Sequence, residues 1–296
     1  ERERERERET NKMEETSAAQ ARDTAYTGDP NYRPYTEGFR SYAPHPHLFH
    51  PQRAFRHRLL QQAAHKWDKF FKAHGDKFFK DRHYLEREFP ELQQYEGQSG
   101  VVFLEAGCGA GNTLFPVMEA HPSWKYYAFD FAPSAVDIVK SHPLLSTRDC
   151  TAFVADLSTG QLPDPDPIPD GSVHLCTLIF VLSALPPERV PDTLALLHRK
   201  LSPGGSLCLR DYMRLDLRQD RFLGADGREG TSQDSQPTRH LEDHLFYRGD
   251  GTLVNFFDPD ELASQLQAAG FEVVEVKRVE REITNHKTST TMERKW

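Results

Sequence analysis

Apolar and polar residues follow two different periods along this chain of 296 residues. From Phe55 to His74, apolar side chains recur at steps of three and four residues, which predicts a helix with one apolar face. The residues on that face are Phe55, Leu59, Ala63, Trp67, Phe70 and Phe71. Because an apolar stripe is stable only when it is covered, we expect this helix to pack against another part of the protein.

After Gly97 the pattern changes to short apolar runs that are separated by stretches typical of helices. Five runs predict β-strands: Val101 to Leu104, Trp124 to Phe129, Thr151 to Val154, Val173 to Val181 and Ser206 to Leu209. Strands that alternate with helices predict a parallel sheet covered by helices.

Proline and acidic residues mark where the helices begin. We expect helix starts at Pro133, at Pro186-Pro187 before Glu188, and at Asp258 before Pro259, each at a place where a crossover helix is needed. Near the end of the chain, residues 271–279 and the stretch from Thr288 are expected to pair as an antiparallel hairpin that closes the sheet.

The first fifty residues differ from the rest of the chain. Glu and Arg alternate over the first nine positions, and Pro, Gly, Tyr and charged residues follow without periodicity, which is typical of a flexible tail. The chain opens on Glu rather than Met, so we expect a fragment or a processed form. Three histidines, His45, His47 and His50, lie between prolines without a nearby Cys or carboxylate, and we therefore expect no metal site.

The composition indicates a globular core, with 37% hydrophobic and 11% aromatic residues. No run of eighteen apolar residues and no secretory signal is visible, so we expect no membrane association and a cytoplasmic location, with nucleus and mitochondrion left open. The four cysteines, Cys108, Cys150, Cys176 and Cys208, form no Cys-x-x-Cys pair and are expected to be buried thiols.

The formal net charge of -8 argues against nucleic-acid binding over the whole surface, but the local charge differs. Residues 53–87 contain ten Lys or Arg against four acids, a local net charge of +6. Aromatic residues are interleaved with these bases, as an RNA-binding element requires for stacking beside phosphate contacts. An amphipathic helix with a solvated basic face explains the same pattern, and both interpretations stay open.

The strongest chemical signal is an apolar strand followed by one carboxylate, Glu105, and three glycines at alternate positions, Gly107, Gly109 and Gly111. Glycines there allow a tight turn and the close approach of a ligand. A dinucleotide site prefers the spacing G-x-G-x-x-G, and Glu105 would repel a pyrophosphate. The same carboxylate suits the amino group and the positive charge of S-adenosylmethionine.

Two further acids end the next strands. Asp130, nineteen residues after Gly111, is placed to accept hydrogen bonds from both hydroxyls of a ribose. Asp156 and Leu157 suit an adenine, the carboxylate accepting from its amine and the leucine packing on its face. The alternative is that each acid caps a helix or lies on the surface. Three acids at three successive strand ends favour a single cofactor site.

Several motifs together resemble one family, the class I methyltransferases, and within it the tRNA N3-methylcytidine methyltransferases of the methyltransferase-like group. The motifs are Phe78 to His83, Arg87 to Phe89, Leu104 to Asn112, Leu178 to Ala184, Pro203 to Gly205, Arg210 to Tyr212, Tyr247 to Thr252 and Phe256-Phe257. They occur in the family's order and span residues 66–296.

The resemblance implies a Rossmann-like α/β fold: a mostly parallel sheet with an antiparallel final strand and an N-terminal helical extension. It divides the chain into a tail (1–50), a basic aromatic extension (51–97) and a methyltransferase domain (98–296). It implies methylation at N3 of a cytidine in the tRNA anticodon loop, usually position 32. Cofactor contacts are implied for Trp67, Gly107, Asp130, Asp156, Leu157 and Ile179, and for Phe71, which replaces a tyrosine of the family.

The chemistry of N3 methylation suggests the remaining candidates. We expect Asp211 to be the catalytic carboxylate, which accepts from the N4 amine of the base, and Tyr212 or Phe180 to stack on the base. A salt bridge from Asp211 to Arg210 or Arg214 is the alternative. Arg82, His83 and Arg248 are expected tRNA contacts, with fold-stabilising ion pairs as the competing interpretation. The polar loop 224–243 is longer than the resemblance leads us to expect.

Other functions stay open at this point. A class I methyltransferase that acts on a small molecule or protein would leave the basic extension only as a lid over the cofactor. A non-catalytic tRNA-binding scaffold is disfavoured by the intact glycine loop and the three acids. A nicotinamide dehydrogenase is disfavoured by the glycine spacing. Besides tRNA, an aminoacyl-tRNA synthetase or another RNA-binding protein is a possible partner.

Overall fold

The computed structural model describes residues 49–216, 219, 222, 240–242, 244–285 and 290–295. The expected tail therefore lies outside the described residues except for its last two positions, as do His45, His47 and most of the polar loop 224–243. The chain divides into two compact units, residues 1–58 and 59–296. Of the first unit only the start of helix α2 (Phe49–His74) is described, and all that follows concerns the second.

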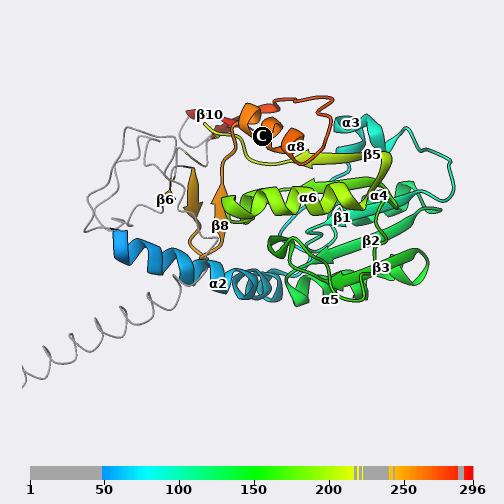
Figure 1. Ribbon diagram of the computed structural model, residues 1–296, viewed down its shortest axis with the longest axis horizontal. Helices are drawn as coiled ribbons and strands as arrows, with labels where there is room; N and C mark the ends of the chain where they lie inside the picture. The colour runs from blue at the N-terminus through cyan, green and yellow to red at the C-terminus, as the bar shows by residue number, and fades with distance from the viewer. Residues whose placement is uncertain are drawn as a thin grey trace, which may run out of the picture. The chain divides into compact units, whose positions relative to one another are not determined.

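Five parallel strands form the central sheet (Figure 1). They are β1 (Val102–Ala106), β2 (Lys125–Asp130), β3 (Asp149–Val154), β4 (Val173–Ile179) and β5 (Leu201–Arg210), in the spatial order β3-β2-β1-β4-β5. The strands expected from the apolar runs are confirmed. Because β1 lies between β2 and β4, the strand order reverses at β1, and the carboxyl ends of β1 and β4 flank a crevice where ligands of such sheets bind.

Helices connect the strands where the sequence predicts crossovers. The α-helices are α3 (Leu85–Glu88), α4 (Leu114–Ala120), α5 (Pro133–Ser141), α6 (Val190–Lys200) and α8 (Pro259–Ala268). Short 3-10 helices are η2 (Pro90–Leu92), η3 (Pro143–Ser146), η4 (Leu157–Thr159), η5 (Leu182–Ala184) and η6 (Pro187–Arg189). The starts at Pro133 and Asp258 are confirmed, and Asp258 caps α8 by accepting from the backbone N–H groups of Asp260 and Glu261. Before α6, the chain first makes one 3-10 turn.

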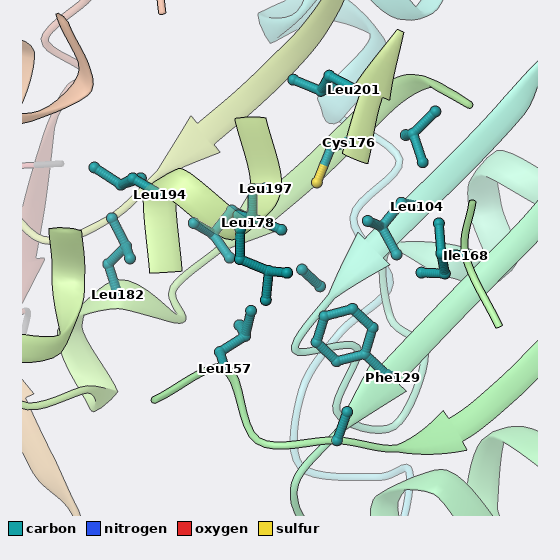
Figure 2. Close-up of a cluster of buried hydrophobic side chains, with 14 of the residues drawn as sticks. Leu104, Phe129, Leu157, Ile168, Cys176, Leu178, Leu182, Leu194, Leu197 and Leu201 are labelled. Carbon is teal, nitrogen blue, oxygen red and sulfur yellow. The ribbon is translucent and has the colours of Figure 1, made fainter. Parts of the chain in front are cut away.

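Each face of the sheet has its own core, because successive side chains of a strand point to opposite faces. On one face Leu104, Phe129 and Leu178 pack with Leu194 and Leu197 of α6 (Figure 2). The other face packs against α3, α4 and α5. Its central residues are Phe103, Leu114, Met118, Trp124, Tyr126, Val136 and Leu175, all at most 1% exposed. The parallel sheet is therefore covered on both sides, as its apolar runs require.

The end of the chain differs in part from the prediction. Residues 271–279 form no strand, and the antiparallel hairpin instead joins β9 (Glu280–Asn285) to β10 (Thr290–Lys295), as a two-stranded sheet separate from the five parallel strands. Residues 271–279 line a cavity of about 760 Å³ together with β5. Val274 and Val276 of this segment are exposed, so alternation of apolar and charged residues did not suffice to bring it into the sheet.

A small three-stranded antiparallel sheet covers the carboxyl end of β5. It consists of β6 (His240–Glu242), β7 (Leu245–Tyr247) and β8 (Leu253–Asn255). Phe246, Val254 and Phe256 form a buried cluster with Tyr212, which follows β5. The segment after β8 pairs with the residues after β5 through hydrogen bonds from Phe257 N–H to the Tyr212 carbonyl (2.9 Å) and from Arg214 N–H to the Phe257 carbonyl (2.9 Å).

Three of the four cysteines are buried, as the sequence predicts. Cys108, Cys176 and Cys208 are buried, Cys150 is half-buried, and burial raises the thiol pKa of all four. Among the described residues, no helix has the length and apolarity that crossing a bilayer demands.

Truncation of a buried core side chain should lower the stability of the protein more than truncation of an exposed one. Leu178 of β4 is fully buried against α6, so we expect Leu178→Ala to lower the free energy of unfolding by about 2–5 kcal/mol. Val274, which is 85% exposed, provides the control. Val274→Ala should change the free energy of unfolding by less than about 0.5 kcal/mol. Urea denaturation measures both variants, and similar losses for the two would contradict this description of the core.

Candidate functional site

The glycine loop between β1 and α4 is built so that only glycine fits. Gly107 and Gly111 have φ angles of 72° and 84°, which side-chain-bearing residues rarely adopt. A Cβ atom at Gly107 would lie 2.6 Å from Cγ2 of Val181, and one at Gly111 would lie 2.3 Å from the ring of Phe115. Both distances are shorter than real contacts allow, so the loop depends on these glycines.

Asp130 joins this loop to the end of β2. Its carboxylate accepts from the backbone N–H groups of Gly109 (2.9 Å) and Ala132 (2.9 Å). Burial raises the pKa of Asp130 to about 6, although these backbone hydrogen bonds act in the opposite direction. Each carboxylate oxygen still has a second lone pair, so the group can accept from hydroxyl donors such as those of a ribose.

Glu105, the last acid before the loop, is 1% exposed. Burial raises its pKa to about 8, opposed by the positive charge of Arg82. Among the described residues its Oε2 atom has no hydrogen-bond partner. With this pKa the group is largely protonated at neutral pH, and a positively charged ligand nearby would favour its ionised form.

The third strand end brings Asp156 and Leu157 beside Asp130. The backbone N–H of Ala155 donates to the Asp130 carbonyl (3.1 Å), and Leu157 is buried. Asp156 also caps η4, because its Oδ1 accepts from the Ser158 N–H at 2.8 Å. Capping and ligand binding are compatible here, since the cap uses one of the two carboxylate oxygens.

Helix α2 packs on the glycine loop through its aromatic face. A Cβ atom at Gly109 would lie 3.2 Å from Cζ of Phe71, so the buried Phe71 ring lies directly against the loop. Trp67 stacks on Phe71, with ring centroids 6.0 Å apart. The guanidinium of Arg248, from the turn between β7 and β8, lies 6.0 Å from the centre of the Trp67 ring. At its C-terminal end, the predicted apolar face therefore packs against the cofactor loop through Phe71.

A second aromatic group lies at the ends of β4 and β5. Phe180 follows the buried Ile179, and its ring centre lies 4.9 Å from that of Tyr212. Its φ angle of 60° is a strained value for a phenylalanine, and its N–H donates to the Arg210 carbonyl at 2.7 Å. Strained residues concentrate at functional sites, which makes Phe180 a strong candidate for contact with a substrate.

Asp211 has backbone partners rather than the salt bridge that was the alternative to its catalytic role. Its Oδ2 accepts from the Ser183 N–H (2.9 Å), and its Oδ1 accepts from its neighbour Tyr212 (2.8 Å). The two arginines considered as partners pair elsewhere, Arg210 with Glu88 and Arg214 with Glu261. Burial raises the pKa of Asp211 to about 6, so the carboxylate is mostly ionised at neutral pH. It directly precedes Tyr212, whose ring contacts that of Phe180.

The segment before α3 is bound to the end of the glycine loop through Asn112 and Thr113, for which the sequence analysis proposed no individual role. Asn112 donates from Nδ2 to the Phe79 carbonyl (3.2 Å) and to Asp81 (3.0 Å). Arg82 donates from its N–H to the Asn112 carbonyl (2.8 Å) and from its guanidinium to Thr113 (2.8 Å). The position of Asn112 and Thr113 directly after the glycines was the available signal.

The predicted tRNA contacts therefore differ in their surroundings. Arg82 is half-buried, and its guanidinium lies 5.9 Å from the centre of the Phe180 ring, with that of Arg210 at 5.8 Å. His83 is exposed. Arg248 donates to the Leu253 carbonyl (2.7 Å), which orders the turn between β7 and β8.

The ion pair of Glu88 with Arg210 joins residues 122 positions apart, and no sequence pattern predicts it.

These residues fit S-adenosylmethionine. Gly107 to Gly111, Glu105, Asp130, Asp156, Leu157 and Ile179 surround the switch point of the sheet, with Trp67 and Phe71 of α2 above the loop. The set combines carboxylates that can accept from the hydroxyls of a ribose, an acidic group for a cation, and apolar side chains that can pack on an adenine. Within the described ranges, no cluster of three or more His, Cys, Asp or Glu side chains could hold a metal ion.

Comparison with known proteins adds independent findings. A family described as a methyltransferase domain matches residues 52–276. The tRNA N(3)-cytidine methyltransferase METTL6 of Rattus norvegicus is 41% identical over 238 residues, covering 79% of this chain and 77% of the relative. The tRNA N(3)-methylcytidine methyltransferase trm141 of Schizosaccharomyces pombe is 35% identical over 237 residues, covering 80% of this chain and 91% of the relative. The tRNA N(3)-cytidine methyltransferase METTL2 of Danio rerio is 36% identical over 271 residues, covering 79% of this chain and 72% of the relative.

The raised pKa of Asp130 predicts how cofactor affinity depends on pH. Below about pH 6 the carboxylate is protonated and loses acceptor capacity, so affinity for S-adenosylhomocysteine should fall by up to tenfold per pH unit as pH decreases. Isothermal titration calorimetry between pH 5 and 7.5 measures this decrease. Asp130→Asn should bind more weakly and lack this acid step. An unchanged acid step in that variant would assign the step to another group.

Proposed function

The chain belongs to the methyltransferase domain family and, within it, to the tRNA N3-cytidine methyltransferases, and from this premise we propose that it methylates N3 of cytidine 32 in the tRNA anticodon loop. S-adenosylmethionine is its cofactor. One observation supports this reading above the others: the glycine loop with Asp130 and the aromatic pair Phe180–Tyr212 with Asp211 lie at the same edge of the sheet.

The reaction requires little acid–base chemistry from the protein. When bound, S-adenosylmethionine supplies a methyl group on a sulfonium. Cytosine N3 has an in-plane lone pair and is unprotonated at neutral pH, so no proton has to be removed before attack. The main task of the protein is to hold the base in line with the methyl group, and positioning of this kind accounts for a large part of many rate enhancements.

Recognition of N3 requires an unpaired or flipped base, because N3 lies on the Watson–Crick edge. We assign Phe180 and Tyr212 as the aromatic side chains on which the cytosine stacks. Phe180 is the better placed of the two, since it is half-buried while Tyr212 is 9% exposed and packs into the small sheet. The strained backbone of Phe180 would keep its ring at the strand end.

Asp211 is proposed as the catalytic carboxylate. Two backbone N–H groups fix its orientation, and each oxygen has a lone pair left for the N4 amine of cytosine. Methylation leaves a positive charge on the base. A fixed, ionised carboxylate stabilises that charge as it develops, without reorganisation during the reaction.

The extension, residues 51–97, is proposed to bind tRNA. Between residues 53 and 87 the local charge is +6, and helix α2 presents Lys69 and Lys72 as exposed side chains. Phe78, which is 54% exposed, contacts Phe70 and His74 in an aromatic group suited to stacking on a base. We propose His83 and Arg248 as further tRNA contacts. Arg82 is proposed to act near the base, because its guanidinium lies over Phe180.

A protein partner is proposed for full activity. An aminoacyl-tRNA synthetase or another RNA-binding protein would supply tRNA selection that the small basic region of this chain does not account for. The overall charge of -8 is consistent with such help, since most of the surface does not attract phosphates. We propose the cytoplasm as the site of this activity.

The reaction can be tested directly. Unmodified tRNA incubated with the protein and labelled S-adenosylmethionine should yield N3-methylcytidine, detected by mass spectrometry of the nucleosides. The signal should be lost with Asp130→Ala and with tRNA that has uridine at position 32. Labelling of another nucleoside, or of the uridine-32 tRNA at an equal rate, would refute the proposed site of methylation.

If Asp211 is the catalytic carboxylate, its removal should affect turnover much more than cofactor binding. Asp211→Ala should lower kcat by about 10²-fold, while the Kd for S-adenosylhomocysteine changes by less than about threefold. Steady-state kinetics and calorimetry measure the two. Losses of similar size in both constants would indicate instead that Asp211 supports the fold through Ser183 and Tyr212.

A further inference from the structure

Helix α5 begins immediately after Asp130 and lacks a capping side chain of its own. Its N-cap residue is Ala132, which has no side-chain oxygen to accept from the first N–H groups of the helix. One of these groups, the N–H of Ala132 itself, donates to Asp130. Another, the N–H of Ser134, donates to a carboxylate from a distant segment, Asp68 of α2, at 2.9 Å.

Asp68 makes a two-way connection with Ser134. The Ser134 hydroxyl donates to the backbone carbonyl of Asp68, also at 2.9 Å. Lys72, one turn further along α2, lies 2.6 Å from the other Asp68 oxygen. Both Asp68 and Ser134 are only 9% exposed, so these hydrogen bonds are largely protected from water. Hydrogen bonding with Lys72 and Ser134 lowers the pKa of Asp68 to about 2, which keeps the carboxylate ionised at physiological pH.

The neighbours of Asp68 place this connection at the cofactor site. Trp67 precedes it, and Phe71, which follows within one turn, packs with Ala110 of the glycine loop and with Ala132 and Ala135 at the start of α5. Helix α2 thus contacts the two loops that Asp130 joins. Asp68 provides the polar contact between them, and Phe71 the apolar one.

We infer that Asp68 is a positioning residue that orders the start of α5, and with it Asp130, only when α2 is packed against the cofactor site. The inference rests on the proposed function, in which α2 belongs to the tRNA-binding extension. It deepens that function by naming the contact through which RNA binding to α2 and cofactor binding to Asp130 affect each other. In this inference Asp68 acts through Ser134 and is not itself a ligand-binding residue.

Such coupling must be reciprocal, because it is a free energy shared by two binding equilibria. A tRNA that holds α2 in place should strengthen cofactor binding, and the cofactor should strengthen tRNA binding by the same factor. Removal of the Asp68 carboxylate should weaken cofactor binding in the absence of tRNA and remove most of the coupling.

The test compares capping substitutions in two helices. Asp68→Ala should raise the Kd for S-adenosylhomocysteine about tenfold, the equivalent of one lost helix cap. It should also speed amide hydrogen exchange of residues 59–74 in the protein without ligand. Asp258→Ala removes a cap of the same type from α8, which contributes no residue to the site, and should leave this Kd unchanged. Calorimetry measures Kd, with and without unmodified tRNA, and circular dichroism checks folding.

Conservative variants keep the test decisive if Asp68→Ala folds poorly. Asp68→Asn retains an acceptor for the Ser134 N–H, so its Kd should stay within about threefold of the unmodified chain. Lys72→Ala removes the ion pair, and in the absence of tRNA it should have a similarly small effect on the Kd for S-adenosylhomocysteine. An unchanged Kd in folded Asp68→Ala, or an equal rise in Asp258→Ala, would overturn the inference.

The outcome is separable from that of the proposed function. If no N3-methylcytidine is formed by the unmodified chain but Asp68→Ala still weakens S-adenosylhomocysteine binding and speeds exchange in α2, the substrate assignment fails while the positioning role of Asp68 stands. If product is formed, and Asp68→Ala changes neither the Kd nor the hydrogen exchange, the substrate assignment stands and the positioning role of Asp68 fails.

Discussion

The carboxylate of Asp130 accepts hydrogen bonds from the loop after β1 and from the start of α5, while its backbone carbonyl accepts from the residue that follows β3. Three strand ends are therefore fixed relative to one another around one buried acid. Burying a charge is costly unless hydrogen bonds compensate for it, so these backbone groups must remain in place for Asp130 to stay ionised. The same arrangement leaves lone pairs of Asp130 free to accept from a ligand. The hydrogen bonds that stabilise the site are therefore also those that orient its ligand-binding carboxylate.

Electrostatics around Phe180 contrast with the acidity of the whole chain. Two guanidinium groups, of Arg82 and Arg210, lie near its ring, and Arg210 is paired with Glu88. The chain as a whole has a net charge of -8. Because Glu88 balances Arg210, Arg82 is the cation beside Phe180 in the region where the reaction is proposed to occur.

Much of this organisation could be read from the sequence, because it follows from local rules. Apolar runs located the five strands, the spacing of Gly107, Gly109 and Gly111 located the loop, and a strand end located Asp130. The contacts of Asp68 with Ser134, and of Glu88 with Arg210, join residues 66 and 122 positions apart, and only the fold brings them together. Residues 271–279 have the alternation of a strand, yet alternation does not specify a partner strand.

The parallel direction of the strands also determines where the chain tolerates alteration. The glycine loop, Asp130, Asp156, Phe180 and Asp211 lie at or directly after the carboxyl ends of strands, so the connections that enter the strands lie at the opposite edge of the sheet. Among them, Gly97 and Gly100 before β1 are exposed, and a Cβ atom at either would meet no other atom within 4 Å. An epitope, a fluorophore or new chain termini introduced between these glycines would therefore report on the enzyme, or immobilise it, with the reaction edge left open to RNA.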